Sequence, residues 1–414
     1  MYRFVAAILI LILGFGIFNH YKKKSSPTVS TKIATFKPRQ GMLAATSEQV
    51  LAINAEGHIY GFGLNRQHEL GLTGMQSVPV PKLVSEQRNW HYVYLGSKVS
   101  FAIDQYGKLW RRIYLGNNHM SPAELTEIGE RTHYYKIDDQ LTFIKAMEHN
   151  GTAVALDDTQ RMWVWRETSE SSVSQYTSRI KDAPPDRIEA QPMKQWLDFC
   201  FADHALLAID DAGLLWQAGA KELEEARRNN SSANLNVTLS KVSTNIPPVK
   251  HIYCPASYGT VMLLDGKGEL WGYGKNSYGE LGTGDGSVDR RNSHPVNSAS
   301  RLAPGFYTEL APSAGFTLAI HRDGSLWAWG LNTSGQLGIG KETSGSDKPR
   351  LVDNAHTWIA IAAGHSFAAG ITSDGELLTW GQNSQGTLGE GGSTPMRDRP
   401  LPVFDKQKWG GNVQ

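Results

Sequence analysis

The chain has 414 residues, 40% of them hydrophobic, and its 41 basic and 40 acidic residues leave a formal net charge of +1. This balance excludes the strongly basic surface that general nucleic-acid binding requires, so we expect no nucleic-acid partner. The 42 Gly residues and 10% aromatic residues suit a turn-rich all-β chain better than a helical one.

Residues 1–24 differ from the rest of the chain. An uncharged apolar run, FVAAILILILGFGIF, fills residues 4–18, between Arg3 and the lysines at 22–24. It is shorter than the ~20 residues that cross a bilayer core, but it suits a short anchor helix or a signal peptide. No small-x-small cleavage site follows, which favours an uncleaved single-pass N-terminal membrane anchor over a removed signal. A buried strand is the third alternative.

The side of the membrane on which the following chain lies stays open. The lysine triplet favours the cytoplasm by the positive-inside rule, whereas Arg3 and the terminal amine favour the opposite side. A short anchor ahead of a whole folded domain is a common export arrangement, so the expectation inclines slightly to the extracytoplasmic side. Residues 25–40 are polar and contain Pro, which indicates a linker.

From residue 41 to residue 414 the chain repeats itself. The clearest unit, TLAIHRDGSLWAWGLNTSGQLGIG, spans residues 317–340. Its apolar residues alternate on both sides of Asp323-Gly324, a dipeptide that favours a two-residue hairpin turn. Trp327 and Trp329 then lie on one face of the second strand. The closing Gly-Gln-Leu-Gly predicts a tight return that buries Leu337.

An aromatic column fixes the number of repeats. The turn position recurs at intervals of 50 to 56 residues, and Gln160 replaces its Gly once. Three residues after each turn, the residues are Tyr60, Trp110, Trp163, Trp216, Trp271, Trp327 and Leu378. Seven slots with five Trp predict seven repeats, and we expect these Trp side chains, Trp271 and Trp327 among them, to form the buried core between repeats.

This pattern resembles the regulator-of-chromosome-condensation repeat family. The resemblance rests on the Asp-Gly turns, the strand Trp327–Gly330, and an Asn-x-x-Gly-x-Leu-Gly motif at residues 276–282, 332–338 and 383–389. It implies an all-β fold, a seven-bladed β-propeller of about 50-residue repeats over residues 41–414. Trp409 aligns with Trp358, so we expect the two chain ends to complete one blade together, which removes open sheet edges.

Repeats two to four lose the Asn and Leu-Gly part and carry polar stretches at residues 111–124, 167–192 and 221–244. Loops of this kind arise by drift at little cost, or they form a rim that touches a partner. On the second interpretation, aromatic, His and Arg side chains are the candidate contacts. These candidates are Tyr114, His119, Tyr176, Arg179, Arg227 and Arg228.

The search for chemistry gives no catalytic constellation. No phosphate-binding Gly-rich loop, His-Glu-x-x-His or Cys-x-x-Cys occurs, so we expect no enzyme activity, no cofactor and no metal. Cys200 and Cys254 are the only cysteines, and we interpret them as two small core side chains, not a disulfide framework. A hydrolase would need clustered carboxylates; those near the turns are Asp104, Asp210, Asp265 and Asp374.

The first functional hypothesis is therefore a membrane-tethered, non-enzymatic module that binds another protein and is itself monomeric. The family resemblance implies an alternative, because its members include nucleotide exchange factors for a small nuclear GTPase. The same family also includes secreted bacterial inhibitors of β-lactamases, which only bind other proteins. An exchange factor requires a cytoplasmic or nuclear propeller, so membrane topology separates the two hypotheses.

Overall fold

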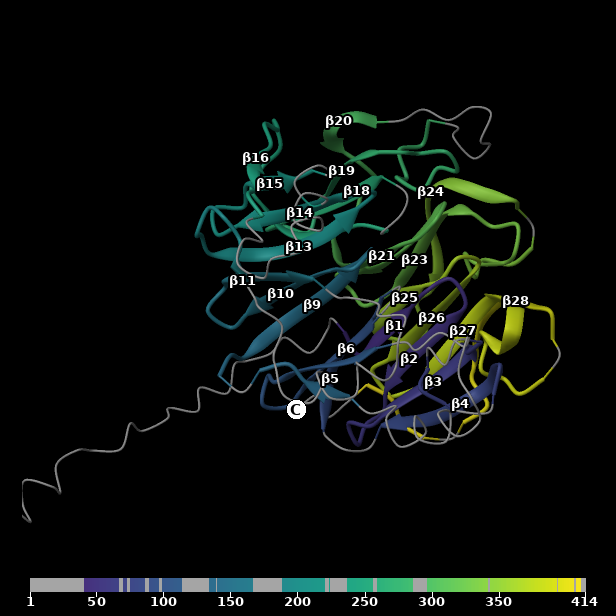
Figure 1. Cartoon of the computed structure of the whole chain (residues 1–414). Coiled ribbons are helices and arrows are strands. Elements are labelled where there is room, and N and C mark those ends of the chain that lie inside the picture. Colours follow the sequence, from purple (N-terminus) through teal and green to yellow (C-terminus); the bar gives the residue numbers. More distant parts are fainter. Residues whose placement is uncertain are drawn as a thin grey trace, which may run out of the picture. The chain divides into compact units, whose positions relative to one another are not determined.

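A computed structural model describes residues 41–410 except for residues 67–69, 73–74, 86–88, 97–98, 114–133, 139, 167–187, 220–222, 224–236, 256–258, 286–295, 342, 393 and 406. All of these belong to a compact unit that begins at Lys37. The unit contains seven antiparallel sheets of four strands each, and each sheet is one blade of a β-propeller (Figure 1).

Within each blade the strands follow one another in sequence order from the innermost to the outermost. Blades 1 to 3 consist of β1 (Leu43–Ala45), β2 (Gln49–Ile53), β3 (Ile59–Leu64) and β4 (Ser77–Ser85); β5 (Trp90–Leu95), β6 (Val99–Asp104), β7 (Leu109–Ile113) and β8 (Tyr135–Lys136); β9 (Phe143–His149), β10 (Thr152–Asp157), β11 (Met162–Arg166) and β12 (Ile188–Glu189). Blades 4 and 5 consist of β13 (Trp196–Ala202), β14 (Ala205–Asp210), β15 (Leu215–Ala218) and β16 (Ser240–Lys241); β17 (Val249–Tyr253), β18 (Thr260–Asp265), β19 (Leu270–Gly274) and β20 (Val296–Arg301). Blades 6 and 7 consist of β21 (Tyr307–Pro312), β22 (Phe316–His321), β23 (Leu326–Leu331) and β24 (Gly345–Asp353); β25 (Trp358–Ala363), β26 (Phe367–Thr372), β27 (Leu377–Gln382) and β28 (Met396–Pro402).

The expected seven-bladed all-β propeller is thus confirmed. A short 3-10 turn, η2 (Ser384–Gly386), lies between β27 and β28. Among the described residues no helix is both long and apolar enough to cross a lipid bilayer. The expected anchor at residues 4–18 lies outside the described part of the chain, as do the linker residues 25–40.

The second strand is buried along its whole length in five blades (β2, β6, β10, β18 and β26), and in β14 and β22 all but one end residue is buried. Neighbouring blades cover both of its faces, which explains its nearly continuous apolar sequence. The hairpin that follows is longer than the expected two residues, since in blade 6 Ile320 pairs with Leu326 and Gly324 N–H donates to the His321 carbonyl. Gly324 takes φ +86°, and Gln160 takes φ 65° at the same place in blade 3.

The aromatic column is less buried than the sequence suggested. Trp163, Trp216, Trp271 and Trp327 are half-buried. The fully buried indoles belong to other columns, chiefly the start of the first strand and the second Trp of Trp-x-Trp. These residues are Trp90, Trp165, Trp196, Trp329 and Trp380. The expectation that Trp271 and Trp327 form the core between blades was therefore wrong. In blade 6 the fully buried indole is Trp329, two residues further along the strand, whereas in blade 5 the residue at that position, Tyr273, is half-buried like Trp271.

The Asn-x-x-Gly-x-Leu-Gly return explains this difference. In blade 6 the Asn332 side chain accepts a hydrogen bond from Leu337 N–H (3.0 Å) and donates to the carbonyls of Gly340 and Thr343 (both 3.0 Å). The return is thereby held as a compact loop, and Leu337 is fully buried, as expected.

Each return then meets the next blade. Trp380 donates its indole N–H to the carbonyl of Gln336 (2.9 Å), and Trp329 donates in the same way to Glu280 (2.8 Å). Phe62 occupies the equivalent place against blade 7, and at the seam between blades 1 and 2 the guanidinium of Arg112 donates to Leu70 (2.9 Å). The motif is therefore a blade-to-blade joint.

Replacing Gly338 by Ala is expected to lower the free energy of unfolding by about 1–3 kcal/mol, because this residue has φ +72°. A Cβ there would also lie 2.9 Å from the Trp380 indole nitrogen. Urea unfolding measures the change. Gly392→Ala is the matched control, since a Cβ at Gly392 meets nothing closer than 3.6 Å. Equal midpoints for the two variants would contradict the joint.

The ring closes within blade 1. Trp409 forms a β-bridge with Asn54, Ala55 N–H donates to the Lys408 carbonyl (2.8 Å), and Gly410 N–H donates to the Ile53 carbonyl (2.9 Å). Residues 408–410 and β1 therefore pair with one and the same strand, and they lie end to end along it. The innermost strand of blade 1 is built from both ends of the described chain.

Candidate functional site

The six candidate partner contacts lie outside the described residues. Tyr114 and His119 fall in the gap 114–133, Tyr176 and Arg179 in 167–187, and Arg227 and Arg228 in 224–236. The structure does describe the strands that lead into these loops, β7, β11 and β15, and each belongs to a regular blade. The three loops therefore leave blades 2, 3 and 4 from equivalent positions, after the third strand.

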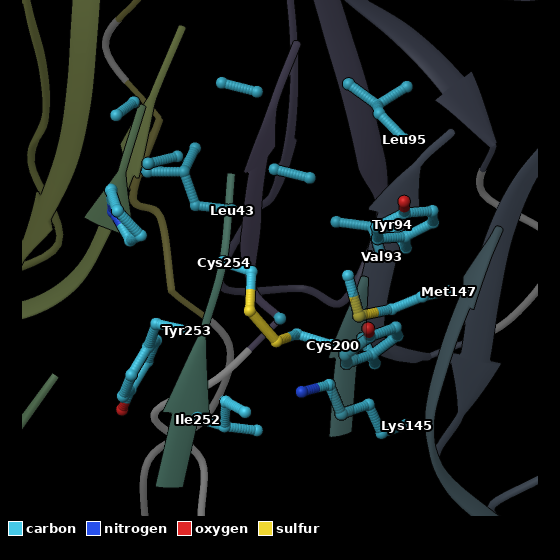
Figure 2. A pocket seen from close by; sticks show the side chains of 17 residues that line it. Leu43, Val93, Tyr94, Leu95, Lys145, Met147, Cys200, Ile252, Tyr253 and Cys254 are labelled. Carbon is cyan, nitrogen blue, oxygen red and sulfur yellow. A yellow bond between two sulfur atoms is a disulfide. The ribbon is translucent and has the colours of Figure 1, made fainter. Parts of the chain in front are cut away.

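A cavity of about 230 Å³ is lined by residues in or next to the first strands of all seven blades. Most of its lining is apolar, including Leu43, Val93 and Ile252, with Lys145 as a charged member (Figure 2). Its position on the axis of the ring follows from this lining. Sequence reasoning did not find it, because each strand contributes only one to four residues.

A polar ladder connects the blades along this inner surface. The Tyr92 hydroxyl donates to the Ala146 carbonyl of the next blade (2.9 Å). Lys145 donates to the Asp198 carboxylate (2.6 Å) and to the Phe199 carbonyl (2.7 Å). Asp198 in turn accepts from Ile252 N–H (3.1 Å), so blades 2 to 5 are linked in series.

Asp198 is the centre of this ladder. It is buried, which by itself raises the pKa of its carboxyl, but the Lys145 ammonium, which donates to it, and the neighbouring His251 imidazole outweigh burial, and its pKa is lowered. The His251 Nδ1 lies 3.6 Å from the carboxylate. Asp198 is therefore a charged structural acceptor shared by three blades.

The two cysteines correct the sequence interpretation. Cys200, on β13 of blade 4, forms a disulfide with Cys254, which directly follows β17 of blade 5 (Figure 2). The residues are 54 positions apart, close to one repeat length, so equivalent strands of neighbouring blades bring them together. They are not two separate core side chains. Both sulfur-bearing residues line the cavity.

The carboxylates near the turns also have structural partners. Asp104 and Asp210 accept from the indole N–H groups of Trp110 (3.0 Å) and Trp216 (2.9 Å), six residues later. Asp265 does the same with Trp271 at 3.4 Å. Each also accepts backbone N–H groups of its own turn; for Asp210, these bonds and Lys194 outweigh burial and lower its pKa.

Asp374 accepts from the Thr372 hydroxyl, the main cause of its lowered pKa. The four carboxylates occupy separate blades, so the structure does not bring them together. Among the described residues, no group of three or more His, Cys, Asp and Glu side chains could hold a metal ion.

Part of the repeat region matches a known repeat family. The regulator of chromosome condensation (RCC1) repeat matches residues 56–103 and 323–371, and a second form of this repeat matches residues 358–387. These segments fall in blades 1, 2, 6 and 7, most of them in the part of the ring that keeps the return motif.

Curated relatives share the repeats over different lengths. Human "E3 ubiquitin-protein ligase HERC2" is 25% identical over 88% of this chain, which spans 8% of that protein. The Arabidopsis thaliana "RCC1 domain-containing protein RUG3, mitochondrial" is 31% identical over 47% of this chain and 44% of its own length. The chain thus spans less than half of these relatives.

Solved structures share the fold. The complex of Kap60 bound to yeast RCC1 (Prp20) matches with a TM-score of 0.66 and 17% identity, covering 92% of this chain and 90% of that chain. Prp20p from Saccharomyces cerevisiae, described with its binding properties to Gsp1p and histones, matches with a TM-score of 0.65 and 16% identity over 88% of each chain.

Proposed function

We propose, on the premise that this chain is an RCC1-repeat β-propeller, that it is a non-enzymatic platform that binds another protein and is held at a membrane. The observation that carries the proposal is the joint-by-joint closure of the ring. Indole–carbonyl bonds, the Arg112–Leu70 hydrogen bond, the polar ladder and the paired chain ends join the seven blades in series around the ring. A rigid scaffold lowers the ordering cost of association for the loops it carries.

Similar proteins support a protein partner. The titles of two solved relatives describe binding to Kap60, to Gsp1p and to histones. Because the sequence identity of this chain to these proteins is 17% or less, their particular partners are not proposed for it. They support the class of function, in which a propeller of this fold contacts other proteins.

The three long loops of blades 2 to 4 are the proposed contact region. A full-length chain with residues 114–133, 167–187 and 224–236 each replaced by a short Gly-Asn linker keeps all described strands. The native chain and the trimmed chain are each cross-linked in the native cell. The proteins that each of them captures are then identified and compared. Partners captured by the native chain and lost by the trimmed chain support the proposal. Partners retained equally by both exclude the loops.

Tethering rests on the apolar run at residues 4–18. The Cys200–Cys254 disulfide supports an extracytoplasmic location, because disulfides persist mainly in oxidising compartments. We expect a reporter fused after Gln414 that is active only outside the cytoplasm to be active, and the protein to remain in the membrane fraction after alkaline washing. A reporter active only in the cytoplasm would reverse the orientation.

The alternative is nucleotide exchange on a small GTPase. It is favoured only by the fold shared with yeast RCC1, and it requires a cytoplasmic propeller. Release of a fluorescent guanine nucleotide from candidate GTPases tests it. Acceleration by the native chain would replace the platform proposal with an exchange activity.

A further inference from the structure

The Cys200–Cys254 disulfide lies at a seam that other contacts also hold together. The seam between blades 4 and 5 is already joined by Asp198, which accepts from Ile252 N–H across it. It is also filled by apolar side chains, among them Leu207, Ile209 and Val261. Opening the disulfide therefore leaves the two blades in contact.

The two sulfur atoms differ in their surroundings. Cys200 is 2% exposed and sits within strand β13. The carbonyl of the residue before it, Phe199, accepts a hydrogen bond from Lys145. Cys254 is half-buried and follows the end of β17. Both line the cavity of about 230 Å³, and Figure 2 shows the disulfide joining their two strands. A small molecule in the cavity thus reaches Cys254 more easily than Cys200.

We propose that this disulfide is a reaction site for low-molecular-weight thiols that enter the cavity in the folded protein. Thiol–disulfide exchange depends on which sulfur is accessible and proceeds through a mixed disulfide. The thiolate of the small molecule attacks Cys254 Sγ, the bond between the two cysteines breaks, and its electron pair leaves with Cys200 Sγ, which takes up a proton.

A second small thiol completes the reaction. It attacks the sulfur of the first small thiol in the mixed disulfide and releases Cys254 as a thiol. Two small thiols are oxidised to one small disulfide, and the protein disulfide is reduced to two thiols. The site goes beyond the proposed platform function, and it needs no partner protein.

The test uses the full chain in detergent with cysteamine as the probe and no denaturant. Reaction is stopped by N-ethylmaleimide, and mass spectrometry of peptides locates the labels. We expect cysteamine on Cys254 and maleimide on Cys200 at early times. We then expect complete reduction with unchanged circular dichroism and a melting midpoint lowered by about 5 °C, the effect of removing a cross-link over 54 residues.

Single-cysteine variants give an independent measurement. Cys200→Ser leaves Cys254 in the cavity wall and is expected to react with cystamine, the oxidised probe, whereas Cys254→Ser leaves buried Cys200 and is expected to lose this labelling. Reduction that occurs only in guanidinium would show an inert brace and overturn the proposal. Cysteamine found on Cys200, or equal labelling of both variants, would overturn it as well.

Discussion

Replacing Trp329 by Ala is expected to lower the free energy of unfolding by about 3–5 kcal/mol, one of the two largest single effects in this protein. Its side chain is fully buried, and its indole N–H bonds to the Glu280 carbonyl of the preceding blade (2.8 Å). The substitution leaves a cavity at the joint and removes one of the two hydrogen bonds to this carbonyl, which also accepts from the Thr317 hydroxyl (2.8 Å). The urea midpoint measures the loss.

Trp327→Ala is the matched control, because this indole lies on the same strand but is half-buried and bonds only within its own blade, to Ser325 (2.9 Å). A smaller loss of about 1–2 kcal/mol is expected. Trp329→Phe keeps most of the volume and removes the hydrogen bond, at about 1 kcal/mol. If Trp327→Ala proved the more damaging change, the joint would not be the core of the seam.

The second large effect is expected at Asp198. Asp198→Ala leaves the Lys145 ammonium, whose side chain is 17% exposed, without its carboxylate, and leaves Ile252 N–H without its acceptor. Removing one partner of a buried ion pair costs about 3–5 kcal/mol. Adding Lys145→Met to Asp198→Ala should recover part of this loss, because the uncompensated charge is then gone. An additive double variant would contradict the coupling.

The same carboxylate predicts a pH dependence. Its folded pKa is lowered, so its contribution to stability is present above the unfolded pKa of about 3.9 and is lost as the pH falls through the folded value. Stability of the native chain and of Asp198→Asn, measured by urea unfolding from pH 7 to pH 3, should therefore converge at the acidic end. A gap that stays constant below pH 4 would contradict this assignment.

The repeat number, the strands and the buried Leu of the return could all be predicted, because the period and the alternation are local properties of the sequence. Even Gln160, which interrupts the Gly series, takes the positive φ that the alignment required. The depth of the Trp columns could not be predicted. Trp327 and Trp329 share one strand face, and only the loop of the preceding blade decides which of them is covered.

The features of the inner surface did carry a signal in the sequence, in the spacing between repeats. Lys145, Asp198 and His251 are separated by 53 residues each, which equals two of the intervals between turns. Cys200 and Cys254 are separated by 54. Treating each pair of equivalent positions as neighbours in space would have predicted the polar ladder and the disulfide. The candidate contacts in the loops had no such constraint, since those segments have no counterpart in other repeats.

The pairing of residues 408–410 with residues 53–55 limits the order in which the fold can form during synthesis. A ribosome makes blade 1 first, yet that blade lacks part of its innermost strand until residue 410 has left the exit tunnel. Blades 2 to 7 can form during synthesis, whereas the circle itself can be completed only after translation has passed the last blade. Until then, residues 53–55 of blade 1 lack their pairing partner, and their exposed backbone is a surface that chaperones can bind.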